Sequence, residues 1–218
     1  MPVVWTGSRV FFPCLRWRRM ASEIRRIHIT GGPGSGKTWL ATRLSAQLGV
    51  PCFDQDGTAL ALLASLGIPA TVPTPPPEME AGLIESARDF AAGDAWVSDA
   101  SSLTWASPLF ERAEVVVWLD TPPSVALRRV LMRHVRAELR RDNRFPGWRR
   151  MYRFWRWSRR FYTNRNPEGV NPFGTAMTRS TLASMLQAYA EKLVVCRSVG
   201  DLRNLERRLV EQRALEKT

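Results

Sequence analysis

One short segment of the chain carries the residue types that bind phosphate groups. It consists of Gly31, Gly32, Pro33, Gly34, Ser35, Gly36, Lys37 and Thr38. The segment matches the pattern G-x-x-x-x-G-K-[ST], in which glycines let backbone N–H groups converge on phosphate oxygens. In this pattern the lysine reaches the β- and γ-phosphates and the hydroxyl of the last residue binds Mg²⁺. The segment therefore predicts an ATP-binding loop, with Lys37 as its main catalytic charge.

A phosphate loop needs an acidic residue that holds Mg²⁺ through water. Two of the predicted strands end in an acidic residue that could do so. Asp120 follows a run of apolar residues, the pattern typical of such an acid. Asp99 better fits a kinase-type sheet, where the acid lies on the strand beside the loop strand. We prefer Asp99 as the metal residue and keep Asp120 as the alternative, because Asp120 could instead cap the helix that Pro122 introduces.

Two classes of phosphate-loop protein are disfavoured by the motifs that the sequence lacks. It has no N-K-x-D motif, which an ordinary GTPase would need. Asp120 is followed by Thr121 rather than by Glu, unlike the acidic pair of large ring-forming ATPases.

The positive charge of the chain is concentrated in one segment. The formal net charge of the whole chain is +12. Residues 121–165 hold 14 arginines and two acids, so this segment alone accounts for that excess. Such a concentrated field predicts an anionic partner: nucleotide phosphates, nucleic acid or an acidic surface.

Four of these arginines share one face of a predicted helix. Arg129, Arg133, Arg136 and Arg140 are spaced by four, three and four residues. Phosphoryl transfer spreads negative charge over the phosphate oxygens, which enzymes stabilise with Arg, Lys and Mg²⁺. We expect at least one of the four side chains to contact phosphate, and we assign Arg133, Arg136 and Arg140 to the catalytic set.

A second arginine-rich stretch, Trp148–Tyr162, is interleaved with aromatic residues. Helical spacing places its arginines on one face and its aromatic residues on two others. We interpret the aromatic residues as packing of a core or lid. Arginines beside aromatic rings can also bind single-stranded nucleic acid. This leaves an alternative function open: a nucleic-acid-associated P-loop ATPase whose Arg/Trp-rich helices contact DNA or RNA.

The order of predicted elements indicates an α/β protein. Apolar strands alternate with helices, which is typical of a parallel sheet covered on both faces. Helix follows helix within residues 121–175, which predicts an inserted lid. The predicted strands are Ile24–Thr30, Val50–Asp54, Ala95–Asp99, Glu114–Asp120 and Lys192–Cys196; the predicted helices are 39–48, 58–66, 78–92, 122–141, 148–162, 178–189 and one from Asp201.

From Ile27 onward the sequence resembles small P-loop kinases of the adenylate kinase and shikimate kinase type, and most of all the adenylate-kinase-related DNA topology modulation proteins. The resemblance rests on the phosphate loop, on Val50–Asp56, on Trp96–Asp99, and on Leu119–Pro122 with the following Arg129 and Arg133. It also includes the Trp/Arg-rich stretch after Pro146. It implies a three-layer P-loop sandwich with a five-stranded parallel sheet in the order 2-3-1-4-5.

The resemblance further implies an ATP-dependent kinase that moves the γ-phosphoryl group to a small acceptor, nucleotide-like or polyol. Asp56 or Asp54, at the end of the second strand, would meet the acceptor or activate its hydroxyl. Arg133 would lie over the adenine, whose edge the backbone of Ser198–Asp201 would line. A closing lid would contain Arg136, Arg140 and Arg144. Ala100 departs from the pattern, because related proteins often have glycine there.

The remaining features indicate a cytoplasmic protein of one domain, residues 20–218. Three scattered cysteines suggest neither a disulfide framework nor a zinc site. No apolar run approaches the roughly 18 residues of a membrane span. The segment 1–19 lacks the order of a secretory signal. Because Met20 stands shortly before the first strand, we expect the natural start there and interpret residues 1–19 as an extension.

Overall fold

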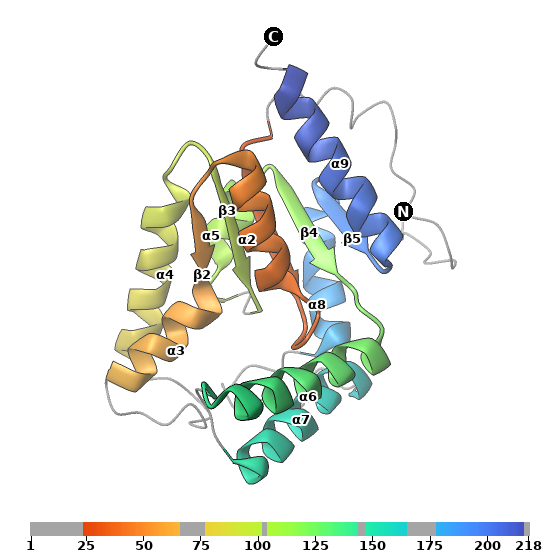
Figure 1. The fold of residues 1–218 in the computed structure, drawn as a ribbon. Coiled ribbons are helices and arrows are strands. Elements are labelled where there is room, and N and C mark those ends of the chain that lie inside the picture. The colour runs from red at the N-terminus through yellow and green to blue at the C-terminus, as the bar shows by residue number, and fades with distance from the viewer. Residues whose placement is uncertain (1–23, 66–76, 102–103, 144–146, 165–177, 216–218) are drawn as a thin grey trace.

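A twisted parallel β-sheet forms the centre of the protein (Figure 1). The computed structural model describes residues 24–65, 77–101, 104–143, 147–164 and 178–215. The strands lie in the order β2-β3-β1-β4-β5. Their bounds are β1 Arg26–Gly31, β2 Cys52–Asp54, β3 Trp96–Ala100, β4 Val115–Leu119 and β5 Leu193–Cys196. The predicted α/β class and strand order are confirmed.

The central strands are buried because helices cover both of their faces. Ile27 of β1 pairs in register with Val97 of β3 and with Val115 of β4. Every residue of β3 and β4 is buried, which explains why β4 has no polar alternation in its sequence.

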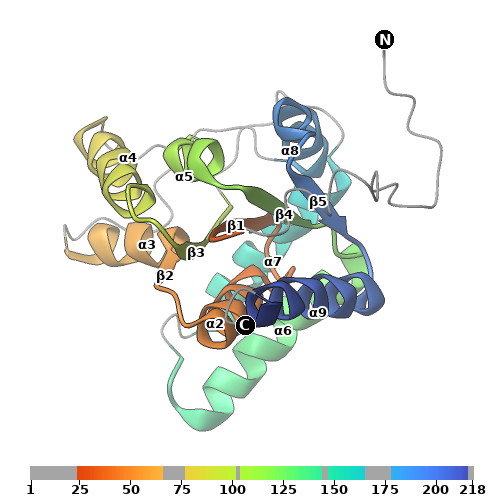
Figure 2. The ribbon, with the colours of Figure 1, turned by 90° about the horizontal axis from the view of Figure 1, so that it is seen from above.

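Helices form the two outer layers, one on each face of the sheet, as Figure 2 shows from above. Helices α2 and α9 pack on the face formed by residues such as Ile27 and Val117, and helices α4, α5 and α8 cover the opposite face, which includes Trp96 and Trp118. Helix α3 adjoins α4 beside β2. Their bounds are α2 Lys37–Leu48, α3 Gln55–Ser65, α4 Pro77–Ala91, α5 Ser107–Arg112, α8 Arg179–Met185 and α9 Val199–Leu215.

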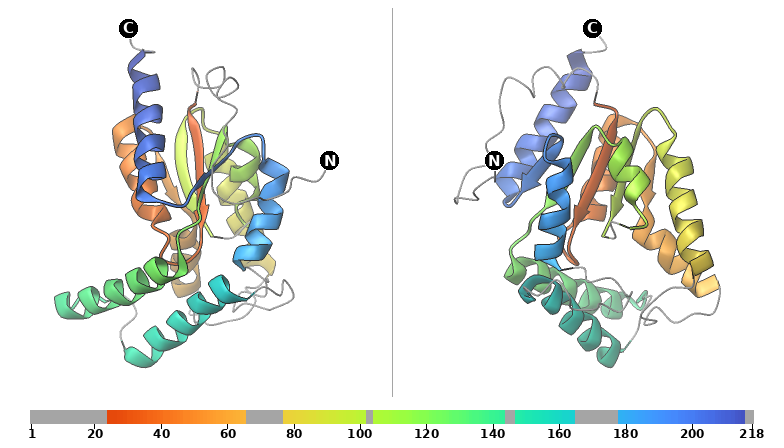
Figure 3. Two further views of the ribbon diagram at one scale, coloured as in Figure 1. Left: turned by 90° about the vertical axis from the view of Figure 1, so that its right-hand side faces the viewer. Right: turned by 180° about the vertical axis from the view of Figure 1, so that it is seen from behind.

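Two further helices lie across the carboxyl ends of the strands (Figure 3). They are α6, Pro123–Arg140, and α7, Trp148–Thr163. They correspond to the helical segment that the sequence predicted as a lid. Among the described residues, no helix has the length and apolarity that crossing a membrane requires.

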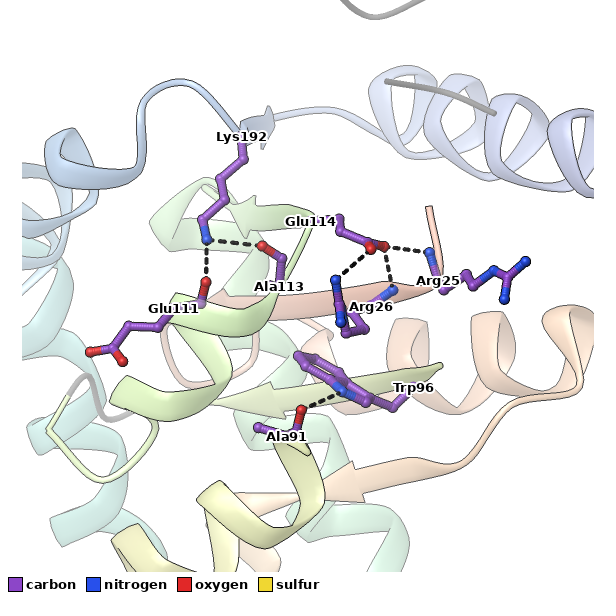
Figure 4. Close-up of polar contacts among 8 residues, drawn as sticks. All are labelled: Arg25, Arg26, Ala91, Trp96, Glu111, Ala113, Glu114 and Lys192. Carbon is purple, nitrogen blue, oxygen red and sulfur yellow. Dashed lines mark hydrogen bonds and ion pairs between the residues drawn. The ribbon is translucent and has the colours of Figure 1, made fainter. Parts of the chain in front are cut away.

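The other end of the sheet is tied together by polar contacts (Figure 4). The Glu114 carboxylate accepts hydrogen bonds from the backbone N–H of Arg25, from that of Arg26 and from the Arg26 guanidinium, at 2.6–2.9 Å. Lys192 donates to the carbonyls of Glu111 and Ala113 at 2.8 and 2.9 Å. These contacts join the amino-terminal ends of β1, β4 and β5. The phosphate loop, Asp99 and Asp120 lie at the opposite, carboxyl-terminal edge.

Three sequence predictions need correction. Helix α5 was not predicted, because its six residues are too few to show a period. The predicted helix 178–189 is α8 followed by a separate 3₁₀ helix, η2, Leu186–Tyr189. Asp56 does not end the second strand: β2 ends at Asp54, and Asp56 lies in the first turn of α3. The expected extension 1–19 and Arg144 lie outside the described residues.

Candidate active site

The phosphate loop joins β1 to α2, as the sequence predicted. Gly34 and Gly36 have φ values of 77° and 100°, in the left-handed region that favours glycine. The N–H of Ser35 donates to the Gly32 carbonyl at 3.1 Å and closes the turn. Gly36 immediately precedes α2, so the loop ends at the helix N-terminus, where free N–H groups attract anions.

Lys37 forms an ion pair with one of the two acids that the sequence proposed for the acceptor. Its Nζ lies 2.9 Å from Asp56 Oδ2. The Ser101 N–H and hydroxyl also donate to the Asp56 carboxylate, at 3.0 and 2.8 Å. Burial raises the pKa of Asp56, but Lys37 and Ser101 outweigh it and lower the pKa overall. Burial likewise lowers the pKa of Lys37, and the neighbouring carboxylates outweigh it and raise the pKa. Both groups therefore stay charged.

Asp54 has a local structural role. Its Oδ1 accepts from the backbone N–H of Gly57 at 2.8 Å, and its carbonyl accepts from the Thr58 hydroxyl at 2.9 Å. Asp54 thus caps the start of α3. Asp56, rather than Asp54, is the acid in contact with the loop lysine.

Thr38 and Asp99 meet beside the loop. The Thr38 hydroxyl donates to Asp99 Oδ2 at 2.8 Å, because Asp99 lies on β3 in register with Ile29 of the adjacent loop strand. The Asp99 side chain is fully buried, and its Oδ1 has no hydrogen-bond partner among the residues that the structure describes. Burial raises the pKa of Asp99 to about 7, despite the opposing effect of Lys37 and Thr38. A buried carboxylate oxygen without a partner is costly unless a ligand satisfies it.

These two side chains fit the requirements of a magnesium site. A threonine hydroxyl and a carboxylate are hard oxygen donors, and Mg²⁺ in such sites is bound by one or two protein groups together with phosphates and water. Among the described residues, no group of three or more His, Cys, Asp or Glu side chains could hold a metal. A cation at Thr38 and Asp99 would therefore need further oxygens, such as those of water or phosphate groups.

Asp120, the alternative metal residue, is engaged elsewhere. Its Oδ1 accepts from Arg179 Nε at 2.6 Å, and its Oδ2 accepts from Arg179 Nη2 at 2.8 Å and from Arg197 Nε at 3.1 Å. Its side chain is 1% exposed. It does not cap α6 either, because that helix has Pro122 at its N-cap and no side-chain cap bond. The geometry thus favours Asp99 for the metal.

Helices α6 and α7 pack directly against the phosphate loop. Arg129 of α6 donates to the Ser35 carbonyl at 2.9 Å, and Tyr162 of α7 donates its hydroxyl to the Pro33 carbonyl at 2.9 Å. Burial raises the pKa of Tyr162, so this phenol remains protonated. A Cβ at Gly32 would collide with the ring of Phe161. The loop and the two helices therefore form one packed unit.

The remaining predicted binding residues lie around this unit without contacting the loop. Arg133, Arg136 and Arg140 are exposed on α6. They lie within about 60° of Arg129 around the helix, so the basic stripe starts at the loop and extends away along α6. Ser198 precedes α9 and is exposed; its N–H donates to Asp201, whose N–H donates back to the Ser198 hydroxyl.

Sequence reasoning missed several residues that complete the site. Ser101 holds Asp56, Tyr162 holds the loop, and Arg179 and Arg197 hold Asp120. Arg197 directly follows β5 at the active edge of the sheet, which was a usable signal. Arg179 had no such signal, because it begins helix α8 and does not follow a strand.

Comparisons with known proteins give a likeness to solved structures only. No protein-family model matches the chain, and no curated protein matches it. A gluconokinase from Sinorhizobium meliloti 1021 superimposes with a TM-score of 0.47 at 16% identity, covering 88% of this chain and 93% of that one. A shikimate kinase from Acinetobacter baumannii in complex with shikimate gives 0.47 at 17% identity, covering 91% and 98%. These values assign neither a family nor an activity.

Proposed function

We propose that the protein is a magnesium-dependent phosphotransferase that moves the γ-phosphoryl group of ATP to a hydroxyl of a small acceptor. One observation carries the proposal. The phosphate loop presents two adjacent residues, Lys37 and Thr38, each paired with a different acid: Asp56 is 29% exposed and Asp99 is fully buried. Lys37 contacts Asp56 and Thr38 contacts Asp99, so the same loop has a catalytic pair and a metal-binding pair.

Lys37 and Asp56 divide the work of phosphoryl transfer. When Lys37 turns to the β- and γ-phosphates, it neutralises charge that develops on the transferred group. Its pull on Asp56 then weakens, so Ser101 remains to oppose burial, which raises the pKa of that carboxylate. Asp56 accepts the proton of the acceptor hydroxyl as the bond from that oxygen to the γ-phosphorus forms and the bond to the leaving ADP oxygen breaks. Ser101 keeps the carboxylate in place during the exchange.

Thr38 and Asp99 would hold Mg²⁺. The ion would bridge phosphate oxygens and neutralise their charge. The free Oδ1 of Asp99 faces no competing donor, and the hydrogen bond from Thr38 orients the carboxylate.

The helix α6 supplies further positive charge. Arg129 already contacts the loop, and Arg133, Arg136 and Arg140 continue the same face. We assign Arg133 to the adenine and the other two to the transferred phosphate, with the Ser198 backbone at the adenine edge. The sequence resemblance to adenylate-kinase-related proteins supports a nucleotide-like acceptor, and the shikimate-kinase type supports a polyol.

An ADP-release screen tests the proposal. Nucleoside monophosphates, nucleosides, polyols and a single-stranded oligonucleotide are offered as acceptors, with ATP and Mg²⁺. One small-molecule class should raise ADP formation above the rate without acceptor. Lys37→Ala should lower that rate by about two orders of magnitude or more. Arg43→Ala is the matched control, because Arg43 is a cation of the same helix that pairs with Glu206 outside the loop.

Two results would contradict the proposal. Equal rates for the wild type and Lys37→Ala would remove the lysine from the chemistry. A folded protein that binds ATP and releases ADP with none of the small acceptors would exclude a small-molecule kinase.

A further inference from the structure

The outer face of α7 carries a row of arginines that the proposed reaction does not use. Arg149, Arg153, Arg156 and Arg160 follow each other at spacings of four, three and four residues, and all four are exposed. Helical geometry puts them within about 60° of one another. The 16 residues of α7 include no acid. We call this surface the α7 arginine row.

The row points away from the phosphate loop. The buried side of α7 contains Ser158 and Phe161, and Tyr162 on that side reaches the loop. At about 100° per residue, the centre of the arginine row lies roughly 160° around the helix from the midpoint between Phe161 and Tyr162. These arginines therefore cannot meet the phosphates of a nucleotide in the loop while α7 keeps its packing.

Aromatic side chains border the row. Tyr152 is 54% exposed; Trp148 is 57% exposed, and its ring also packs edge-on against His134 of α6. The Arg156 guanidinium lies 5.9 Å from the centre of the Tyr152 ring, within range of a cation–π interaction. Exposed cations beside an exposed aromatic ring match a ligand that has both anionic groups and flat rings.

We propose that the α7 arginine row binds single-stranded nucleic acid, with the arginines on the phosphates and Tyr152 stacked on a base. Proteins that bind single strands without sequence preference combine these two elements. The row from Arg149 to Arg160 is about 16 Å long, which suits a short run of nucleotides. A membrane surface fits less well, because the apolar side of α7, which would have to insert into lipid, is packed against the protein. This binding requires no catalysis at the loop.

Fluorescence anisotropy with a labelled 15-residue oligothymidylate tests the proposal on the full-length protein. One variant changes the four row arginines to Gln. A matched control changes four exposed arginines elsewhere to Gln and so removes the same charge: Arg25, Arg88, Arg112 and Arg203. The row variant should bind at least tenfold more weakly at about 100 mM salt, and the control should bind nearly as well as the wild type. The slope of log affinity against log salt should shrink by about 2.8, at about 0.7 for each lost phosphate contact.

A second comparison separates nucleic acid from acidic polymers in general. Tyr152→Ala should weaken oligothymidylate binding about fivefold or more, since stacking on an aromatic ring is lost. The Tyr152→Ala variant should bind heparin, an anionic polymer without bases, as tightly as the wild type does. Equal losses in the row variant and the matched control would overturn the proposal. So would a Tyr152→Ala variant that binds the oligonucleotide like the wild type, or tighter binding to anionic vesicles than to the oligonucleotide. Thermal unfolding checks that each variant is folded.

Discussion

The packing of α7 on the phosphate loop can be tested by adding one methyl group at Gly32. A Cβ at this position would lie 2.7 Å from Phe161 Cδ1 and 2.7 Å from the Tyr162 hydroxyl, and closer still to Phe161 Cε1. Gly32 does not have a positive φ, so the backbone at this position tolerates alanine. The whole effect of Gly32→Ala should therefore come from overpacking, which typically costs about 1–3 kcal/mol of unfolding free energy.

Urea unfolding of single and double variants measures this cost. Phe161→Ala alone should destabilise the protein by about 3–5 kcal/mol, because the ring is 5% exposed. In the Phe161→Ala background, Gly32→Ala should lose at least half of its penalty, because the ring that it strikes is gone. Gly82→Ala is the control: a Cβ there meets nothing within 4 Å, and alanine inside α4 should stabilise the helix by about 0.5–1 kcal/mol.

The double-variant result decides whether α7 covers the loop in solution. If Gly32→Ala costs the same with and without the Phe161 ring, the two residues are not in contact. A cost below about 0.5 kcal/mol in the wild-type background would lead to the same conclusion. Either outcome would separate the lid helices from the loop and weaken the assignment of Arg129 and Tyr162 to the site.

Three further variants probe the site. Asp99→Asn, measured in EDTA, should be up to about 4 kcal/mol more stable than the wild type at pH 8 and should differ little from it at pH 4. The pKa of Asp99 is about 4 in the unfolded chain and is raised to about 7 in the folded protein, so the stability of the wild type should fall as the pH rises from 4 to 7. Equal pH profiles for the two proteins would contradict the raised pKa. Asp120→Asn should lower the free energy of unfolding by about 1–3 kcal/mol, since two half-exposed arginines lose their buried partner. Adding Arg179→Gln to this variant should lower the stability little further. Additive losses would exclude the ion pair between Arg179 and Asp120. Tyr162→Phe should lower stability by about 0.5–1.5 kcal/mol through the lost bond to Pro33, and an unchanged unfolding midpoint would show that the bond is absent.

Strand β4 could be predicted from the sequence because it is a short apolar run that is buried on both faces. Val115–Leu119 has no polar residue, and the structure buries all of it. Helix α5 escaped prediction because Ser107–Arg112 makes less than two turns. Asp56 was predicted at the end of the second strand but lies in α3. No local pattern in the sequence showed that β2 has only three residues and that α3 follows it directly.

The sequence indicated those candidate-site residues whose positions depend on chain neighbours or on strand order. Lys37 and Thr38 belong to one motif, and Asp99 meets Thr38 because β3 lies beside β1. Partners brought in by later helices could not be predicted. Arg179 and Tyr162 reach the loop region from segments whose direction depends on tertiary packing.

Asp99 and Asp120 show why a pattern alone does not assign an acid to a metal. Both lie at the carboxyl-terminal edge of the sheet: Asp99 is on β3 and Asp120 directly follows β4, the two strands that flank β1. What separates them is the charge of the neighbours. Asp120 is neutralised by two arginines, so a cation there would have to displace both. Asp99 has one neutral donor and one oxygen without a partner, so it gains most when a cation arrives. The cost of leaving that oxygen unsatisfied is the physical reason to propose Asp99 as the residue that would hold a metal.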